Sequence, residues 1–198
     1  MIFKAILALQ PVFVALAILY LLDSFKLIKY STILKYVIYG ILIAFINFGL
    51  NIVFQDIFSM NQNIITHYSA PFFEELTKAV VPLYLIKRGK IGFPVDAAII
   101  GFSVGCGFAF TENIYYLINV TESNYFFWII RGFGTAVMHC GNTAVMSIIS
   151  ILLVDRFKKS SLLIFLPGFL IAFLVHSLFN HFFLPPVFNV LSQIIILP

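Results

Sequence analysis

Residues 95–118 read VDAAIIGFSVGCGFAFTENIYYLI, a stretch with the length and apolar character of a membrane-crossing helix. Such a helix needs about 20 apolar residues to cross roughly 30 Å of hydrocarbon. Gly101, Gly105 and Ala109 recur at four-residue spacing, and a stripe of small residues lets a second helix approach closely. Glu112 continues this stripe, so we expect its carboxylate to lie in a contact between helices. The stretch therefore predicts a helix packed within a membrane bundle.

The composition of the whole chain is typical of a membrane protein. Of the 198 residues, 62% are apolar and only 10% are charged, and the mean hydropathy is +1.06. Soluble domains carry about a quarter of charged residues, so an ordinary water-soluble domain is excluded. The same figures exclude a disordered chain, and two cysteines are too few for a disulfide scaffold. Because no repeat or linker divides the sequence, we expect a single integral-membrane domain over residues 1–198.

Charged loops divide the chain into segments of membrane-crossing length. Cutting at these loops predicts an all-α polytopic membrane helix bundle with six spans, at about 3–22, 36–58, 71–86, 94–118, 126–154 and 161–184. A last apolar stretch, 186–198, is too short to cross without tilting. Whether it spans the membrane stays open, so we expect six to seven transmembrane helices.

Lysine and arginine are distributed unevenly between the loops. Nine of the twelve lie in three short segments: Lys26, Lys29 and Lys35; Lys87, Arg88 and Lys90; Arg156, Lys158 and Lys159. The alternate segments, 59–70 and 119–125, have none. The positive-inside rule then places the three basic loops in the cytoplasm and the N-terminus outside. The net charge of +4 is explained by topology, and we expect no nucleic-acid partner.

Several ionisable side chains fall inside the predicted spans, where each costs roughly 2.5–3.5 kcal/mol on insertion scales. They are Glu74, Glu75, Lys78, Glu112, Arg131, His139 and His176. A rise of roughly 1.5 Å per residue, counted from the cytoplasmic ends, places Glu75 at roughly 18 Å and both histidines at roughly 22 Å above the inner boundary. Glu112 and Asn180 follow at roughly 27 Å. The spacing predicts a polar cavity in the outer half of the bilayer.

Within the span 71–86, a lysine follows two adjacent glutamates. Lys78 lies four residues after Glu74 and three after Glu75, so the three side chains share a helical face. The cation can neutralise one carboxylate and leave the other for acid–base chemistry. The alternative is a structural ion pair near a helix N-terminus, where the helix dipole favours carboxylates.

The polar side chains are those that a hydrolase acting on an amide requires. Glu74 or Glu75 can take a proton from water, His139 can orient that water, and His176 with Asn180 can stabilise an oxyanion. The motifs G-x-S-x-G and H-E-x-x-H are absent. We expect no cofactor, although glutamate and histidine from separate helices can bind zinc.

Two further groups of residues are interpreted as packing features. Asn47, Asn51 and Gln55 form a polar row in the span 36–58, which we assign to hydrogen bonding between helices, with lining of the cavity as the alternative. Cys106 and Cys140 lie within spans, and no exposed cationic setting favours a reactive thiolate. We expect both to pack as small residues.

At these residues the sequence resembles the PrsW-type intramembrane proteases, relatives of the CAAX prenyl endopeptidases. The resemblance rests on Glu74-Glu75-x-x-Lys78, on GFAFTEN ending in Glu112-Asn113, on Arg131 followed eight residues later by His139, and on His176-x-x-x-Asn180. It implies a multi-pass protease of the bacterial plasma membrane with a glutamate-dependent mechanism. Its substrate would be a membrane-spanning protein, which in the best-known relatives is an anti-sigma factor cut at its extracytoplasmic side.

The resemblance also implies residue roles. The implied site has Glu74 and Glu75 as the catalytic acid pair, His139 as water positioner, His176 and Asn180 as oxyanion donors, and Lys78, Glu112 and Arg131 in support. The prenyl endopeptidases have arginine four residues after the second glutamate, whereas this chain has Lys78 three residues after it. Which glutamate faces the water therefore stays open.

Three other functions remain as alternatives. A zinc-dependent membrane protease is the nearest of them. A membrane transporter also buries carboxylates and histidines, although we find no inverted repeats or paired broken helices. A non-catalytic scaffold is the third, because the superfamily includes a membrane subunit of a larger protease; the glutamate pair argues against it.

Overall fold

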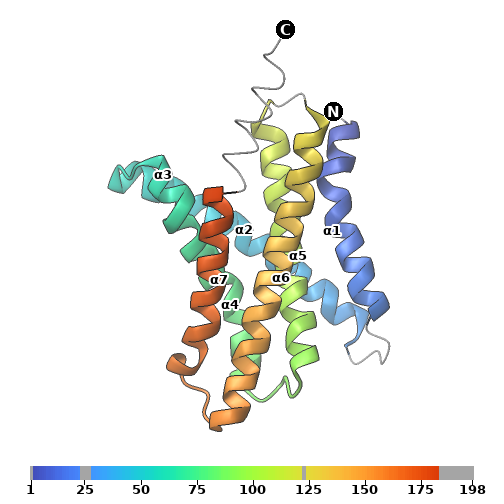
Figure 1. The fold of residues 1–198 in the computed structure, drawn as a ribbon, viewed down its shortest axis with the longest axis vertical. Helices are drawn as coiled ribbons and strands as arrows, with labels where there is room; N and C mark the ends of the chain where they lie inside the picture. The colour runs from blue at the N-terminus through green and yellow to red at the C-terminus, as the bar shows by residue number, and fades with distance from the viewer. Residues whose placement is uncertain (1, 23–27, 122–123, 183–198) are drawn as a thin grey trace.

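The computed structural model describes residues 2–22, 28–121 and 124–182 and contains only helices over these ranges (Figure 1). The elements are α1 (Ile2–Leu22), α2 (Tyr30–Phe58), α3 (Gln62–Ile64), the π-helix η1 (Ile65–Ser69), α4 (Ala70–Lys87), α5 (Pro94–Asn119), α6 (Tyr125–Phe157) and α7 (Leu162–Phe182). The predicted all-α polytopic bundle is confirmed.

Five of these helices, α1, α2, α5, α6 and α7, are long and apolar enough to cross a membrane. Each coincides with a predicted span, although α2 begins at Tyr30 rather than at residue 36. The remaining predicted span, 71–86, corresponds to α4, which has 18 residues and is therefore about 27 Å long. The stretch 186–198 and the end of the span 161–184 lie outside the described residues.

The segment 59–70, expected as a loop, is largely helical. Asn61 caps α3 by accepting a hydrogen bond from the backbone N–H of Asn63 at 2.8 Å. The π-helix η1 then runs directly into α4. Pro71 at the start of α4 has no N–H group, so the widened turn leaves one donor fewer to satisfy. Sequence reasoning missed this extension because the segment is polar and lies between spans.

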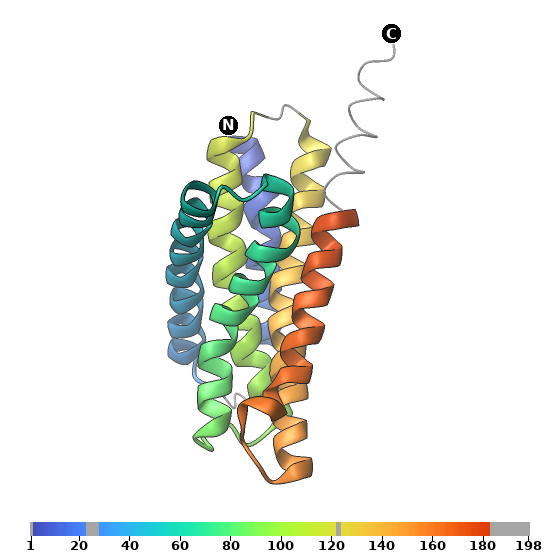
Figure 2. The same ribbon diagram turned by 90° about the vertical axis from the view of Figure 1, so that its left-hand side faces the viewer.

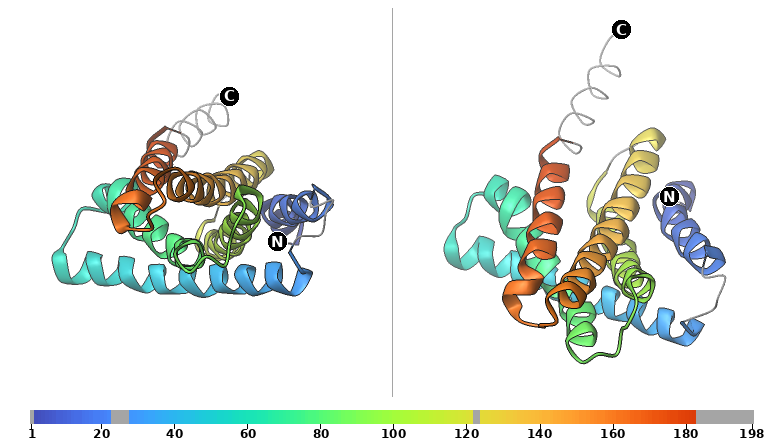
Figure 3. Two further views of the ribbon diagram at one scale, coloured as in Figure 1. Left: turned by 90° about the horizontal axis from the view of Figure 1, so that it is seen from below. Right: turned by 60° about the horizontal axis from the view of Figure 1, so that its bottom comes forward.

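Helix α5 occupies the middle of the bundle, between α2 and α6 (Figure 3). The predicted small-residue stripe makes the contact with α6 close, and Gly40 does the same on the α2 side. A methyl group added at Gly105 would lie 2.3 Å from the backbone oxygen of His139 on α6. At Gly40 of α2 it would lie 2.1 Å from the backbone oxygen of Val104. Glycine at these positions therefore lets the helix backbones touch.

The two cysteines lie in the contact between α5 and α6, as the packing interpretation predicts. Cys106 and Cys140 are fully buried, and their sulfur atoms lie 2.9 Å apart. On the other side of the bundle, α4 lies between α2 and α7 (Figure 2). Four helices, α4 to α7, thus surround the interior at which the predicted polar residues meet.

Candidate active site

Helix α4 carries three charged side chains into the interior of the bundle. Glu75 and Lys78 are fully buried, and Glu74 is 8% exposed. The ammonium group of Lys78 donates a hydrogen bond to Oε1 of Glu75 at 2.5 Å. The predicted neutralisation of one carboxylate is therefore present, and Glu75 is the partner. The Oε2 atoms of Glu74 and Glu75 are buried and have no hydrogen-bond partner within the part of the chain that the structure describes.

His176 on α7 connects the two glutamates. Its Nδ1 lies 2.8 Å from Oε1 of Glu75 and its Nε2 lies 3.7 Å from Oε2 of Glu74. A carboxylate can only accept, so Glu75 favours the tautomer with the proton on Nδ1. The Nε2 lone pair of a neutral ring then faces the carboxylate of Glu74. Two facing acceptors at this separation can share a proton or bind a cation.

His139 on α6 has a partner at each ring nitrogen. Its Nδ1 lies 2.8 Å from Nζ of Lys78, and its Nε2 lies 2.6 Å from Oε2 of Glu112 on α5. A lysine ammonium can only donate, so Nδ1 accepts and the Nε2–H group donates to Glu112. Glu112 also accepts a hydrogen bond from Nη2 of Arg131 at 3.1 Å. The ring of His139 is thereby fixed in one orientation.

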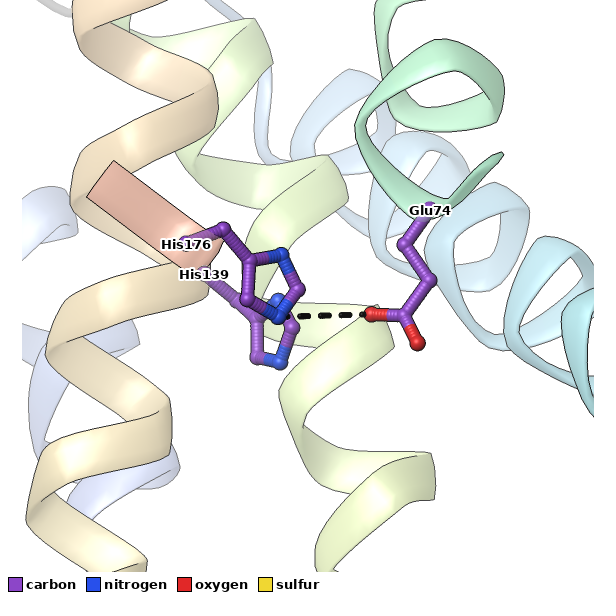
Figure 4. A group of neighbouring side chains, drawn as sticks. All are labelled: Glu74, His139 and His176. Carbon is purple, nitrogen blue, oxygen red and sulfur yellow. Dashed lines mark ion pairs between the residues drawn. The ribbon is translucent and has the colours of Figure 1, made fainter. Parts of the chain in front are cut away.

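These contacts form one continuous chain of hydrogen bonds, which we call the charged network: Glu112, His139, Lys78, Glu75 and His176. Its members come from all four helices α4 to α7. Figure 4 shows Glu74, His139 and His176 pointing toward one another, and the rings of the two histidines lie 5.0 Å apart and nearly perpendicular. The expected convergence of these side chains is thus present in the structure.

Two predicted residues lie at the edge of this network. Asn180, one turn after His176 on α7, donates its side-chain N–H to the backbone oxygen of Thr66 in η1 at 2.8 Å. It therefore ties η1 to α7 and has no hydrogen bond to His176. Arg131 places its guanidinium 3.2 Å from the ring centroid of Tyr116, a cation–π contact that supports its pairing with Glu112.

A cavity of about 180 Å³ adjoins the charged network. From α4, α5 and α7 it is lined by Glu74, Glu112, His176 and Asn180, among others. Glu75 does not line it. Of the two adjacent glutamates, Glu74 is thus the one that lines the cavity.

The polar row on α2 divides between the two interpretations considered for it. Asn47 donates its side-chain N–H to Oγ1 of Thr77 on α4 at 2.8 Å, so it joins two helices as predicted. Asn51 and Gln55 instead line the cavity. Tyr116 also lines it and was not predicted there. Its spacing, four residues after Glu112, was the available signal, because the two share a helical face.

The donors around Glu74 suit a metal ion by type and separation. Glu74, His139 and His176 each offer a ligand atom, and these atoms lie within 4.8 Å of one another. Two imidazoles and one carboxylate are a known catalytic zinc set. The carboxylate of Glu75 on Nδ1 of His176 is the kind of partner that orients a metal-binding histidine. At His139 a metal would have to replace Lys78 or Glu112, since both ring nitrogens are engaged.

Comparison with known proteins agrees with the resemblance found in the sequence. The family model of the PrsW family intramembrane metalloproteases matches residues 29–198. No curated protein and no solved structure matches the chain. The matched region contains α2 and every helix that follows it, with all members of the charged network and the cavity beside them. The chain is therefore a multi-pass membrane protease that belongs to the PrsW family.

Proposed function

We propose that the chain hydrolyses peptide bonds of membrane proteins with Glu74 as the general base. The observation that carries this proposal is the different setting of two adjacent carboxylates. Glu75 is fully buried and bonded to Lys78 and His176. Glu74 lines the cavity and Glu75 does not, although the Oε2 atoms of both lack a hydrogen-bond partner among the described residues. A general base must reach water, and Glu74 is the carboxylate placed to do so.

A water molecule can be held between Glu74 and His176. With the proton of His176 on Nδ1, a water in the cavity donates one hydrogen to the carboxylate of Glu74 and the other to His176 Nε2. Glu74 takes its proton as the water oxygen attacks the carbonyl carbon of the substrate. The same proton then passes to the leaving amine nitrogen when the C–N bond breaks. Glu75 serves as a positioning residue, because its bond to Nδ1 sets the tautomer of His176.

The remaining residues have supporting roles in this proposal. Asn180 lines the cavity and has a second amide hydrogen beyond the one bound to Thr66, which is available for the oxyanion. His139 is bonded on both sides and fixes Lys78 and Glu112. The proposal therefore gives His176 the water-positioning role that the resemblance implied for His139.

A zinc-dependent mechanism is the second candidate, favoured by the Glu74, His139 and His176 donor set and by the family description. These three residues would hold the ion. When bound, zinc would polarise the scissile carbonyl and lower the pKa of a bound water to about 7. Glu75 would still orient His176 through Nδ1 in this case.

For the substrate, we propose a protein anchored in the same bilayer, with an anti-sigma factor as the type that the resemblance implies. The basic loops would face the cytoplasm of a bacterial cell, and the cavity would lie toward the outer surface. Residues 1–198 would act as a single protease domain. The position of the site supports this proposal, because all its residues are borne by helices of the bundle.

The test compares membrane proteins from cells that express the wild-type chain or Glu74→Gln. We expect new N-termini in membrane proteins of the wild-type cells and none with the variant, although both chains accumulate equally in the membrane. The same N-termini in both samples would remove Glu74 from catalysis. Metal analysis of the purified protein, with cleavage measured in chelator, separates the zinc mechanism from the metal-free one.

A further inference from the structure

The outer wall of the cavity carries two amide side chains with unused hydrogen-bonding capacity. Asn51 is half-buried and Gln55 is exposed, and both line the cavity that Glu74 also lines. Neither side chain makes a hydrogen bond within the described part of the chain. Asn47, one turn earlier on the same helix, uses its amide for Thr77 and for the backbone oxygen of Ile43. The N–H groups of Asn47 are thus engaged, whereas, among the described residues, those of Asn51 and Gln55 are free beside the cavity.

A membrane substrate that fills the cavity would remove these two amides from water, so it must offer them hydrogen-bond partners. An amide removed from water without a hydrogen bond costs several kcal/mol by transfer to hydrocarbon. Four residues separate Asn51 from Gln55, so the two side chains lie on one face of α2, about 6 Å apart along its axis. Each amide offers a donor and an acceptor, which are the two groups that a peptide unit also offers.

The spacing of the two amides matches that of an extended peptide. Along one edge of a strand, N–H and C=O groups recur every second residue, at about 6.4–6.8 Å. The amides of Asn51 and Gln55 can therefore pair with an extended peptide much as the edge of a β-strand does. Beside them, the rings of Phe48 and Tyr115 stack at 4.6 Å and form an apolar part of the same cavity wall. A side chain of the bound segment can pack on these rings.

We infer that Asn51 and Gln55 bind the backbone of an extended substrate segment and hold its scissile bond across the cavity from Glu74. The inference rests on the proposed protease function and adds the form in which the substrate binds. A peptide in the bilayer that leaves its helix loses the partners of its backbone groups, and the two amides replace some of them. The substrate class is a membrane span with a locally unwound segment, rich in residues of low helix propensity such as glycine and serine.

Binding to an inactive enzyme tests the inference without depending on cleavage. The probe is a synthetic peptide with one span of about 20 leucine and alanine residues. A Gly-Ser-Gly-Ser segment interrupts the span at about one third of its length, and the peptide carries a fluorophore. Binding is measured in liposomes with the inactive Glu74→Gln protein. We expect the triple variant, which adds Asn51→Leu and Gln55→Leu, to bind the peptide about tenfold more weakly than Glu74→Gln alone. Asn63→Leu serves as the matched control, because Asn63 is exposed and does not line the cavity. Equal Kd values for all three proteins would overturn the inference.

The conformation of the bound peptide is tested by crosslinking. Gln55→Cys is introduced into the Glu74→Gln protein with Cys106 and Cys140 replaced by alanine, and single cysteines are moved through the Gly-Ser segment. We expect disulfides at every second position of the peptide. Disulfides at every third or fourth position, or none, would overturn the inference. Cleavage of the peptide is measured in parallel: alternating crosslinks without cleavage by the wild type would contradict the proposed function and leave the binding inference standing.

Discussion

The charged network and the cavity wall beside it contain the same kinds of side chain but differ in their pairing. In the network, one oxygen of Glu75 accepts from both Lys78 and His176, and His139 is bonded at both nitrogens. On the cavity wall, the amide of Asn51 has no hydrogen bond among the described residues. The Oε2 atoms of both Glu74 and Glu75 lack a partner within the same residues, but only Glu74 lines the cavity. Unpaired groups beside a cavity keep their capacity for water or substrate, so access to the cavity, more than residue type, separates the proposed functional residues from the structural ones.

The largest effect should come from removing the cation of the network with Lys78→Met. Glu75 would then be a buried carboxylate without a countercharge, a change that costs about 3–5 kcal/mol in measured cases. We expect the free energy of unfolding in detergent to fall by this amount and cleavage to be lost. In the double variant that adds Glu75→Gln, the charge is balanced again and most of the stability should return. Stability lower in the double than in the single variant would contradict the pairing.

On the cavity side, His176→Ala should reduce the cleavage rate by about 10²–10³-fold, the loss typical of one hydrogen-bonding group in the reaction site. The reason is that its Nε2 faces Glu74 across the space proposed for water. Stability is measured with the rate, because Glu75 loses a partner as well. A cleavage rate within a few-fold of wild type would show that His176 has only a structural role in the charged network.

The network also depends on how closely α5 approaches α6. Gly105→Ala places a methyl group 2.3 Å from the backbone oxygen of His139. The backbone of His139 cannot move away without shifting its imidazole ring, which is bonded to Glu112 and Lys78. We expect a loss of about 1–3 kcal/mol in unfolding free energy and reduced cleavage. Gly141→Ala on α6 is the matched control, because nothing lies within 4 Å of the added methyl group. Equal stability of both variants would show that the helices can separate without cost.

The sequence was sufficient to predict the bundle and the membership of the network, for identifiable physical reasons. Charged loops delimit apolar spans, and the cost of burying Glu75, Lys78 and His139 in a bilayer requires that they meet. Which of these side chains form hydrogen bonds with one another was harder to predict. Helical spacing allowed Lys78 to reach either Glu74 or Glu75, and the choice depends on where α7 places His176. The π-helix η1 was missed because a polar segment between spans gives no periodic signal.

The smallest expected effect offers the sharpest comparison, because it contrasts two asparagines one helical turn apart on α2. Asn47→Ala removes a hydrogen bond to Thr77 and should lower the unfolding free energy by about 1 kcal/mol. Asn51→Ala removes no bond within the described part of the chain, so its stability should equal that of wild type while substrate binding weakens. Thermal unfolding in detergent and peptide affinity are measured for both. A loss of stability in Asn51→Ala as large as that in Asn47→Ala would show that the row on α2 serves helix packing throughout, as its sequence pattern first indicated.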